Sequence, residues 1–174
     1  MSLRFAVLGL LDDQPSSGYD LLQRFKWTLA NVWPATQSQV YTELAKLAEA
    51  ALITVSDEGP RGRKEYTITA AGRTELQRWL TEIEPKTLVR NEMLIRVFFL
   101  GVVSRADAEE YLARVRARTV EDRADLLQLR DNVDWNTKDD DLSTYGRIAL
   151  EWGLRYNAMN QEWAEWAITQ LPER

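Results

Sequence analysis

Three segments in the first third of the chain have apolar residues at regular structural spacing. Residues 3–11 are almost wholly apolar, which fits either a strand or a short buried helix. Ser17 and Asp20 have the composition of a capping box, in which side-chain oxygens satisfy the free amides of a helix start. An apolar stripe at helical spacing follows them: Leu21, Leu22, Phe25 and Leu29. Trp33 and Pro34 are expected to close this second segment, because the residue before a proline is pushed out of the helical region.

A third helix is predicted to begin at Thr36, where Gln39 completes another capping box. Its apolar residues recur at helical spacing: Val40, Leu44, Leu47 and Ala51. The opposite face carries small or hydrogen-bonding side chains: Ser38, Tyr41, Thr42, Ala45 and Lys46. An exposed helix face is usually rich in flexible Glu and Lys, so this face differs from an ordinary solvated one.

A hairpin and a closing helix are predicted next. Residues 52–56 and 64–69 alternate in polarity like paired strands, and the glycines and proline of residues 57–63 fit an extended turn. Thr69 then caps a helix that ends before Pro85. Three helices, a two-stranded ribbon and a closing helix are the element order of a winged helix-turn-helix. We therefore expect a winged-helix domain over residues 1–84 and a second domain over residues 85–174.

The second domain is predicted to be helical throughout. Residues 91–101 are apolar enough to be buried against another surface, and residues 104–133 and 142–171 each carry a sustained heptad pattern. At 1.5 Å per residue the last helix would be about 40–45 Å long. The expected fold class is mainly α: a winged helix-turn-helix with a two-stranded β wing, followed by an all-α dimerisation domain with long helices.

The last predicted helix carries large apolar side chains along one face: Tyr145, Trp152, Tyr156, Met159, Trp163 and Trp166. A helix this long in a small domain needs a partner to bury such a stripe. The favoured interpretation is therefore a dimer seam or an intramolecular core, and a pocket for a small planar aromatic effector is the alternative. Both can hold, because a seam of mismatched aromatic rings can leave a cavity.

Composition excludes several classes of function. The chain has neither Cys nor His, so it lacks thiol nucleophiles, imidazole bases and zinc sites built from those residues. No convergent acid pair supports a carboxylate enzyme, and we expect no enzymatic activity. Residues 139–141 are acidic but lack the ligand pattern of an EF-hand, so they are interpreted as a helix cap and no metal or other cofactor is expected. Without a membrane-length apolar run or a cleavable leader, the chain is expected to be cytoplasmic.

Charge argues both against and for a nucleic-acid partner. The net charge is −5, so DNA binding requires a local basic cluster rather than bulk charge. Arg61, Arg63 and Lys64 form such a cluster in the predicted turn, where each cation can neutralise a phosphate. The predicted third helix supplies groups that contact phosphates and base edges: Thr36, Gln37, Ser38, Gln39, Tyr41, Thr42 and Lys46.

Helix and wing together predict sequence-specific binding of double-stranded DNA. The alternative is a winged helix that has kept its fold but serves as a protein-interaction or sensor module, which the acidic balance would suit.

Several segments resemble the PadR family of transcriptional regulators. They are residues 5–11, 18–21, 40–47 and 63–73, followed by Leu76, Trp79 and Leu80. The helical remainder resembles the family branch with a large C-terminal domain. The resemblance implies a homodimer, joined by its C-terminal helices, that binds a palindromic operator and usually represses. By position it also implies which residues contact DNA: Tyr19, Ser38, Gln39, Tyr41 and Lys64.

One residue departs from the family pattern. Family members usually have Gly where this chain has Ala51. Gly suits the left-handed conformation that often ends a helix, and Ala is less stable there by about 1 kcal/mol. The third helix is therefore expected to end differently in this chain.

Overall fold

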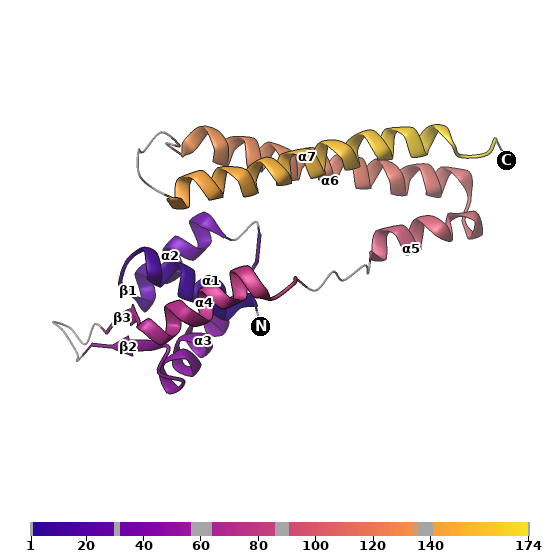
Figure 1. Ribbon diagram of the computed structural model, residues 1–174. Helices are drawn as coiled ribbons and strands as arrows, with labels where there is room; N and C mark the ends of the chain where they lie inside the picture. The colour runs from indigo at the N-terminus through magenta and orange to yellow at the C-terminus, as the bar shows by residue number, and fades with distance from the viewer. Residues whose placement is uncertain are drawn as a thin grey trace. The chain divides into compact units, whose positions relative to one another are not determined.

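The computed structural model describes residues 2–29, 32–56, 64–85, 91–133, 135 and 141–173 (Figure 1). The chain divides into two compact units, Met1–Lys86 and Thr87–Arg174. Arg61, Arg63 and the acidic residues 139–140 lie outside the described residues, so their predicted roles stay predictions. In the described part of the chain, no helix is both long and apolar enough to cross a membrane.

The N-terminal unit has the winged helix-turn-helix order that the sequence predicts. Its elements are α1 (Ser2–Asp13), β1 (Ser16–Ser17), α2 (Gly18–Thr28), α3 (Gln37–Glu49), β2 (Ile53–Val55), β3 (Glu65–Ile68) and α4 (Ala70–Glu82). β2 and β3 pair antiparallel with Val55 opposite Tyr66, which confirms the predicted hairpin. β1 pairs with the other edge of β3 and makes the sheet three-stranded, in the order β1-β3-β2. A two-residue strand leaves no alternation in the sequence, so β1 was not predicted.

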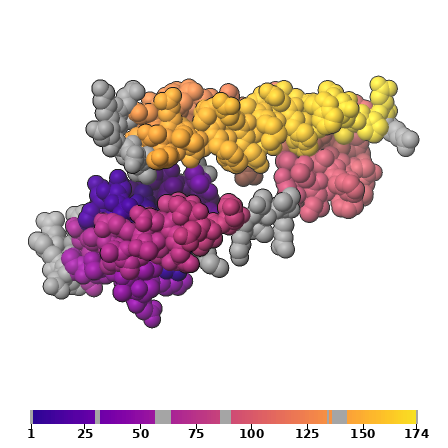
Figure 2. Space-filling model, in the orientation of Figure 1, coloured from indigo at the N-terminus to yellow at the C-terminus, as the bar shows by residue number. Residues whose placement is uncertain are grey.

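The core of this unit lies among its first three helices. α1 is a helix rather than a strand, and its buried residues Val7, Leu8, Leu10 and Leu11 face several directions, as in a helix packed on more than one side. Phe25 of α2 and Leu44 of α3 are buried in the same cluster. In Figure 2 the described side chains of this unit, indigo to magenta, pack closely together.

The ends of two helices of this unit differ from what the sequence predicts. α2 ends at Thr28, before Trp33 and Pro34, because the amides of Val32 and Trp33 turn back to the Leu29 carbonyl. At the end of α3, Ala51 has a φ of 55° and lies in the left-handed region.

The end of α3 is a Schellman motif built with alanine. The Leu52 amide donates to the Leu47 carbonyl at 3.0 Å, and the Ala51 amide donates to the Ala48 carbonyl at 3.0 Å. The expectation of a different helix end is therefore wrong, because Ala51 adopts the left-handed conformation that glycine usually takes at such a position. Ala51 is exposed and lies beyond the buried stripe of α3 in which the sequence pattern placed it.

The start of α4 is fixed against the end of α3. The Thr69 hydroxyl accepts from the Gly72 amide at 3.1 Å and lies 3.0 Å from the Ala51 carbonyl, to which it donates. Gly72 packs on the backbone: a Cβ there would lie 2.2 Å from the Leu52 carbonyl oxygen. Farther along α4, Trp79 stacks on Phe5 with ring centroids 4.6 Å apart. The wing strands are thereby attached to the helical core.

The C-terminal unit consists of helices. They are α5 (Glu92–Phe98), the 3-10 turn η2 (Leu100–Val102), α6 (Arg105–Asn132) and α7 (Asp141–Thr169). α6 and α7 run antiparallel and side by side along most of their length (Figure 1). Between them lie the buried residues Leu112, Thr119, Leu126, Leu150, Leu154, Ala164 and Ala167. The Arg116–Glu165 ion pair, at 2.9 Å, joins the two helices from outside.

Candidate nucleic-acid interface

The first turn of α3 is held by the capping box that the sequence predicts. The Gln39 amide donates to Thr36 Oγ1 at 3.3 Å, and the Thr36 amide donates to Gln39 Oε1 at 2.8 Å. These contacts fix the direction in which α3 begins. They also engage the side-chain oxygens of both residues, so the side-chain Nε2 of Gln39 is the donor that stays available to another molecule.

The outer face of α3 is exposed along its length while Val40, Leu44 and Leu47 are buried. Two of its exposed polar side chains are bound within the helix. Thr42 Oγ1 donates to the Ser38 carbonyl at 2.7 Å, and Lys46 Nζ lies 3.1 Å from Glu43 Oε1. Within the described residues, the side chains of Gln37, Ser38 and Tyr41 have no hydrogen-bond partner.

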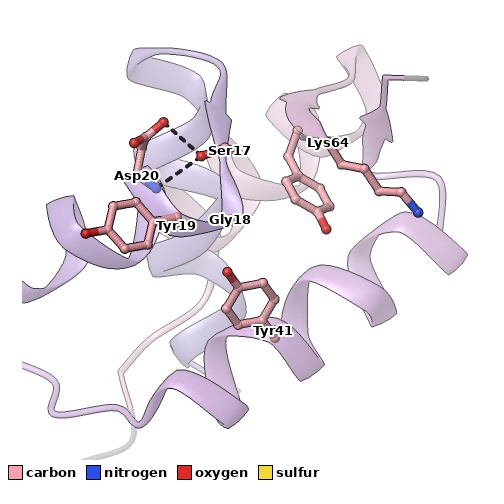
Figure 3. A pocket seen from close by; sticks show the side chains of 7 residues that line it. Ser17, Gly18, Tyr19, Asp20, Tyr41 and Lys64 are labelled. Carbon is pink, nitrogen blue, oxygen red and sulfur yellow. Dashed lines mark hydrogen bonds between the residues drawn. The ribbon is translucent and has the colours of Figure 1, made fainter. Parts of the chain in front are cut away.

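An open groove of about 540 Å³ lies between α2, α3 and β3 (Figure 3). It is lined by Ser17, Gly18, Tyr19, Asp20, Tyr41, Lys64 and Tyr66. Ser17 holds the groove's α2 side, since its hydroxyl accepts from the Asp20 amide at 3.2 Å and donates to the Asp20 carboxylate at 2.8 Å. Figure 3 shows the Tyr41 ring rising from α3 with its hydroxyl on the side of Gly18.

The groove brings together three predicted site residues from distant parts of the sequence: Tyr19, Tyr41 and Lys64. Gly18, Asp20 and Tyr66 belong to the same groove and were not predicted as site residues. Tyr66 could have been found, because residues two apart in a strand point to the same face and Lys64 is two residues earlier. The place of Gly18 depends on tertiary packing, which no local pattern shows.

The aromatic stripe of α7 does not form the intramolecular core. Tyr145, Trp152, Tyr156, Met159 and Trp166 are exposed, Trp152 by 68%, and Trp163 is half-buried. The seam with α6 instead uses residues such as Leu150 and Leu154, which lie two positions from Trp152 and thus about 200° around the helix. The core interpretation is therefore wrong, because the stripe is largely exposed in the described structure.

A second apolar surface lies on α5 and η2. No residue of α5 is buried, and Phe98 and Val102 are 82% and 83% exposed. The burial expected for residues 91–101 is thus not provided by the described part of this chain. Contiguous exposed apolar surfaces often mark sites of contact with another molecule.

The fold and the groove together define a winged-helix protein with a helical C-terminal unit. Residues 7–78 match the model of the PadR-like family of transcriptional regulators, and residues 89–172 match the family described as the C-terminal region of virulence activator alpha. The negative transcriptional regulator PadR of Bacillus subtilis is 37% identical over 112 residues, which cover 62% of each protein. A probable transcriptional regulator of Mycobacterium tuberculosis is 38% identical over 85 residues, which cover 47% of this chain and 45% of that protein.

These matches span less than two thirds of either curated relative, but the solved structures match over nearly the whole chain. Bacillus subtilis PadR in complex with operator DNA has a TM-score of 0.84 at 28% identity, over 99% of this chain and all of that one. The same protein in complex with p-coumaric acid has a TM-score of 0.86 at 27% identity, over 98% and 99%. The Vibrio cholerae virulence activator AphA, at 24% identity and a TM-score of 0.81 over 97% of each chain, shares the fold.

The N-terminal unit thus matches the PadR-like family, whose members are transcriptional regulators and not enzymes, and the chain as a whole shares the fold of Bacillus subtilis PadR.

Proposed function

We propose that this chain binds a specific sequence of double-stranded DNA and represses transcription from it. The observation that carries the proposal is the exposed face of α3, where Gln37, Ser38 and Tyr41 stand beside a groove that also contains Lys64. Amide and hydroxyl side chains read base edges, and cations hold phosphates. The Bacillus subtilis relative has been solved with operator DNA on the same fold, which supports this choice.

Different residues of the interface would have different roles. Gln37 and Ser38, in the first turn of α3, would reach base edges in the major groove. Tyr19, Tyr41 and Lys64 line the groove beside that helix and would hold the phosphate backbone. Arg61 and Arg63, next to Lys64 in sequence, would add further phosphate contacts.

A homodimer would provide two such surfaces. The exposed stripe of α7 and the apolar surface of α5 and η2 are the regions of the C-terminal unit that a second copy would bury. Two copies related by a twofold axis would place two α3 helices in successive major grooves, about 34 Å apart, and would therefore require a palindromic operator. A dimer also doubles the local basic cluster of a chain whose net charge is −5.

The proposal is tested on a duplex selected from random-sequence DNA by the wild-type protein. Replacing Tyr41 and Lys64 with Ala together should weaken binding by at least about a hundredfold, since each removes a contact to a charged phosphate. Lys26→Ala, which removes an exposed lysine of α2 outside the groove, should bind like the wild type. Unchanged affinity in the double variant would contradict the assignment. Failure of the wild type to select any duplex would favour the protein-interaction alternative.

We also propose that a small aromatic acid relieves this repression. Trp135, Thr144, Arg147, Ile148 and Glu151 line an open groove of about 360 Å³ in the C-terminal unit, where Arg147 offers a partner for a carboxylate. The relative's complex with p-coumaric acid suggests the probe. p-Coumaric acid should quench tryptophan fluorescence and release the selected duplex, its methyl ester should do so more weakly, and Arg147→Ala should remove that difference. Equal effects of acid and ester would exclude this groove.

A further inference from the structure

Gly18, the first residue of α2, is buried against the ring of Tyr41. A Cβ at Gly18 would lie 2.7 Å from Tyr41 Cε1 and 3.1 Å from both Cζ and the hydroxyl oxygen. The shortest of these distances is closer than real Cβ atoms come to another heavy atom. Any other residue at position 18 would therefore displace the Tyr41 side chain.

The backbone of Gly18 gives no other reason for a glycine. Its φ lies outside the left-handed region, and alanine is more stable than glycine in a helix. Its neighbours Ser17 and Asp20 already provide the cap of α2. The close approach of Tyr41 is thus the feature of the described structure that requires a residue without a side chain at position 18.

Tyr41 held in this place presents its hydroxyl to the groove. Tyr41 is 38% exposed, and no described residue accepts a hydrogen bond from its hydroxyl. Tyr66 of β3 and Lys64, two residues earlier, line the same groove, which therefore also contains a further phenol and an ammonium. The Asp20 carboxylate, on the α2 side, accepts from the Ser17 hydroxyl. O–H and N–H⁺ donors together favour an anionic acceptor such as a phosphate oxygen.

We infer that Gly18 is a positioning residue for DNA binding, and that the Tyr41 hydroxyl it positions donates to one backbone phosphate in each half-site. This inference rests on the proposed function. Gly18 would thus contribute to the affinity for DNA although it has no side chain, because it leaves room for the ring of Tyr41.

A double-mutant cycle on the wild-type-selected duplex tests the coupling. Gly18→Ala and Tyr41→Phe should each weaken binding by about tenfold, the size expected for one hydrogen bond to a charged group. Because both changes remove the same contact, Gly18→Ala should add no further loss to Tyr41→Phe or Tyr41→Ala. Gly9→Ala is the matched control: nothing described lies within 4 Å of a Cβ there, and it should bind like the wild type.

A folding defect in Gly18→Ala would be recognised by its rescue. If the added methyl group lowers the melting temperature, Tyr41→Ala should restore it, because the ring that the methyl group meets is then absent. A melting temperature that stays low with Tyr41→Ala would place the clash elsewhere and overturn the inference.

Replacing single charged phosphates of the DNA with neutral groups identifies the phosphate that accepts the hydrogen bond from Tyr41. Single methylphosphonate substitutions are placed along one half-site of the selected duplex, and at one linkage the wild type should lose about tenfold in affinity. Gly18→Ala and Tyr41→Phe should be insensitive to that substitution. Additive losses in the cycle, or equal sensitivity of all three proteins at every linkage, would overturn the inference and leave the proposed function intact. A wild-type protein that selects no duplex would instead remove both.

Discussion

Ala51 shows how a single unfavourable residue is tolerated at a helix end. Its φ of 55° lies in the region that disfavours side chains by about 1–2 kcal/mol, yet the Schellman hydrogen bonds of α3 are complete. The amide of the next residue, Leu52, and the hydroxyl of Thr69 both bind in this corner, so a different helix end would disrupt several contacts at once.

Ala51→Gly should therefore stabilise the N-terminal unit. Relief of the left-handed strain is partly offset by the greater freedom of glycine in the unfolded chain, about 0.4–1 kcal/mol, which leaves a gain of about 0.5–1 kcal/mol in the free energy of unfolding. Urea denaturation measures it. Ala50→Gly is the control, because Ala50 has a φ of −79° and should lose stability with glycine. A loss of stability in Ala51→Gly would contradict this account.

Gly72 is the opposite case, a glycine that backbone contact requires. Gly72→Ala should lower the free energy of unfolding by about 3 kcal/mol, because its Cβ would meet the Leu52 carbonyl at 2.2 Å and a backbone atom cannot rotate away. Thermal unfolding checks this. Gly101→Ala, where nothing described lies within 4 Å of a Cβ, should not be destabilised. Similar losses for both would mean that the contact with the Leu52 carbonyl is not the cause.

At the scale of the elements, the parts predicted correctly are those whose cause is local. The capping box of α3, its apolar stripe and the hairpin alternation each depend on residues within one turn or one strand pair. The end of α2 was missed because the turn at Leu29 precedes the strong signal of Pro34. The groove around Gly18 depends on three elements meeting, so the sequence indicated Tyr19, Tyr41 and Lys64 but not their arrangement.

The face of α7 that packs on α6 was misassigned for a different reason. α7 carries two apolar stripes, and periodicity does not say which of them meets α6. The sequence prediction assigned the stripe with the larger aromatic residues to the contact. The seam with α6 instead uses smaller residues such as Gly153 and Ala164, which let two long helices approach closely. A Cβ at Gly153 would lie 2.9 Å from Leu126 Cδ1. Close helix packing thus left the aromatic rings outside.

Leu112 tests the α6–α7 seam as a unit. It is 1% exposed, and Leu112→Ala should lower the free energy of unfolding of the C-terminal unit by about 2–4 kcal/mol through the lost contacts and the cavity. The loss of the helical circular dichroism signal on heating measures it. Val120→Ala, on the exposed side of the same helix, should change stability little. Equal losses would indicate that α6 packs differently from the described seam.

At the scale of the whole molecule, the proposed DNA binding of this acidic chain would depend on two copies acting together. A single copy of this chain, with a net charge of −5, has a small basic footprint, and linking two footprints raises the effective concentration of the second by orders of magnitude. Affinity for a palindromic site should therefore depend on residues of α7 that would not contact DNA themselves.

Trp152→Asp tests this dependence directly. A carboxylate in the middle of the exposed α7 stripe would be buried without a partner in the dimer, so the protein should become monomeric in light-scattering measurements while keeping its helical content. Its affinity for the palindromic duplex should fall by at least about a hundredfold, and its affinity for a single half-site should stay near that of the wild type. Val120→Asp, on the exposed side of α6, should leave both mass and affinity unchanged. If Trp152→Asp stays dimeric and binds the palindrome normally, the α7 stripe is not the surface that joins the two copies, and the exposed face of α5 and η2 becomes the place to look.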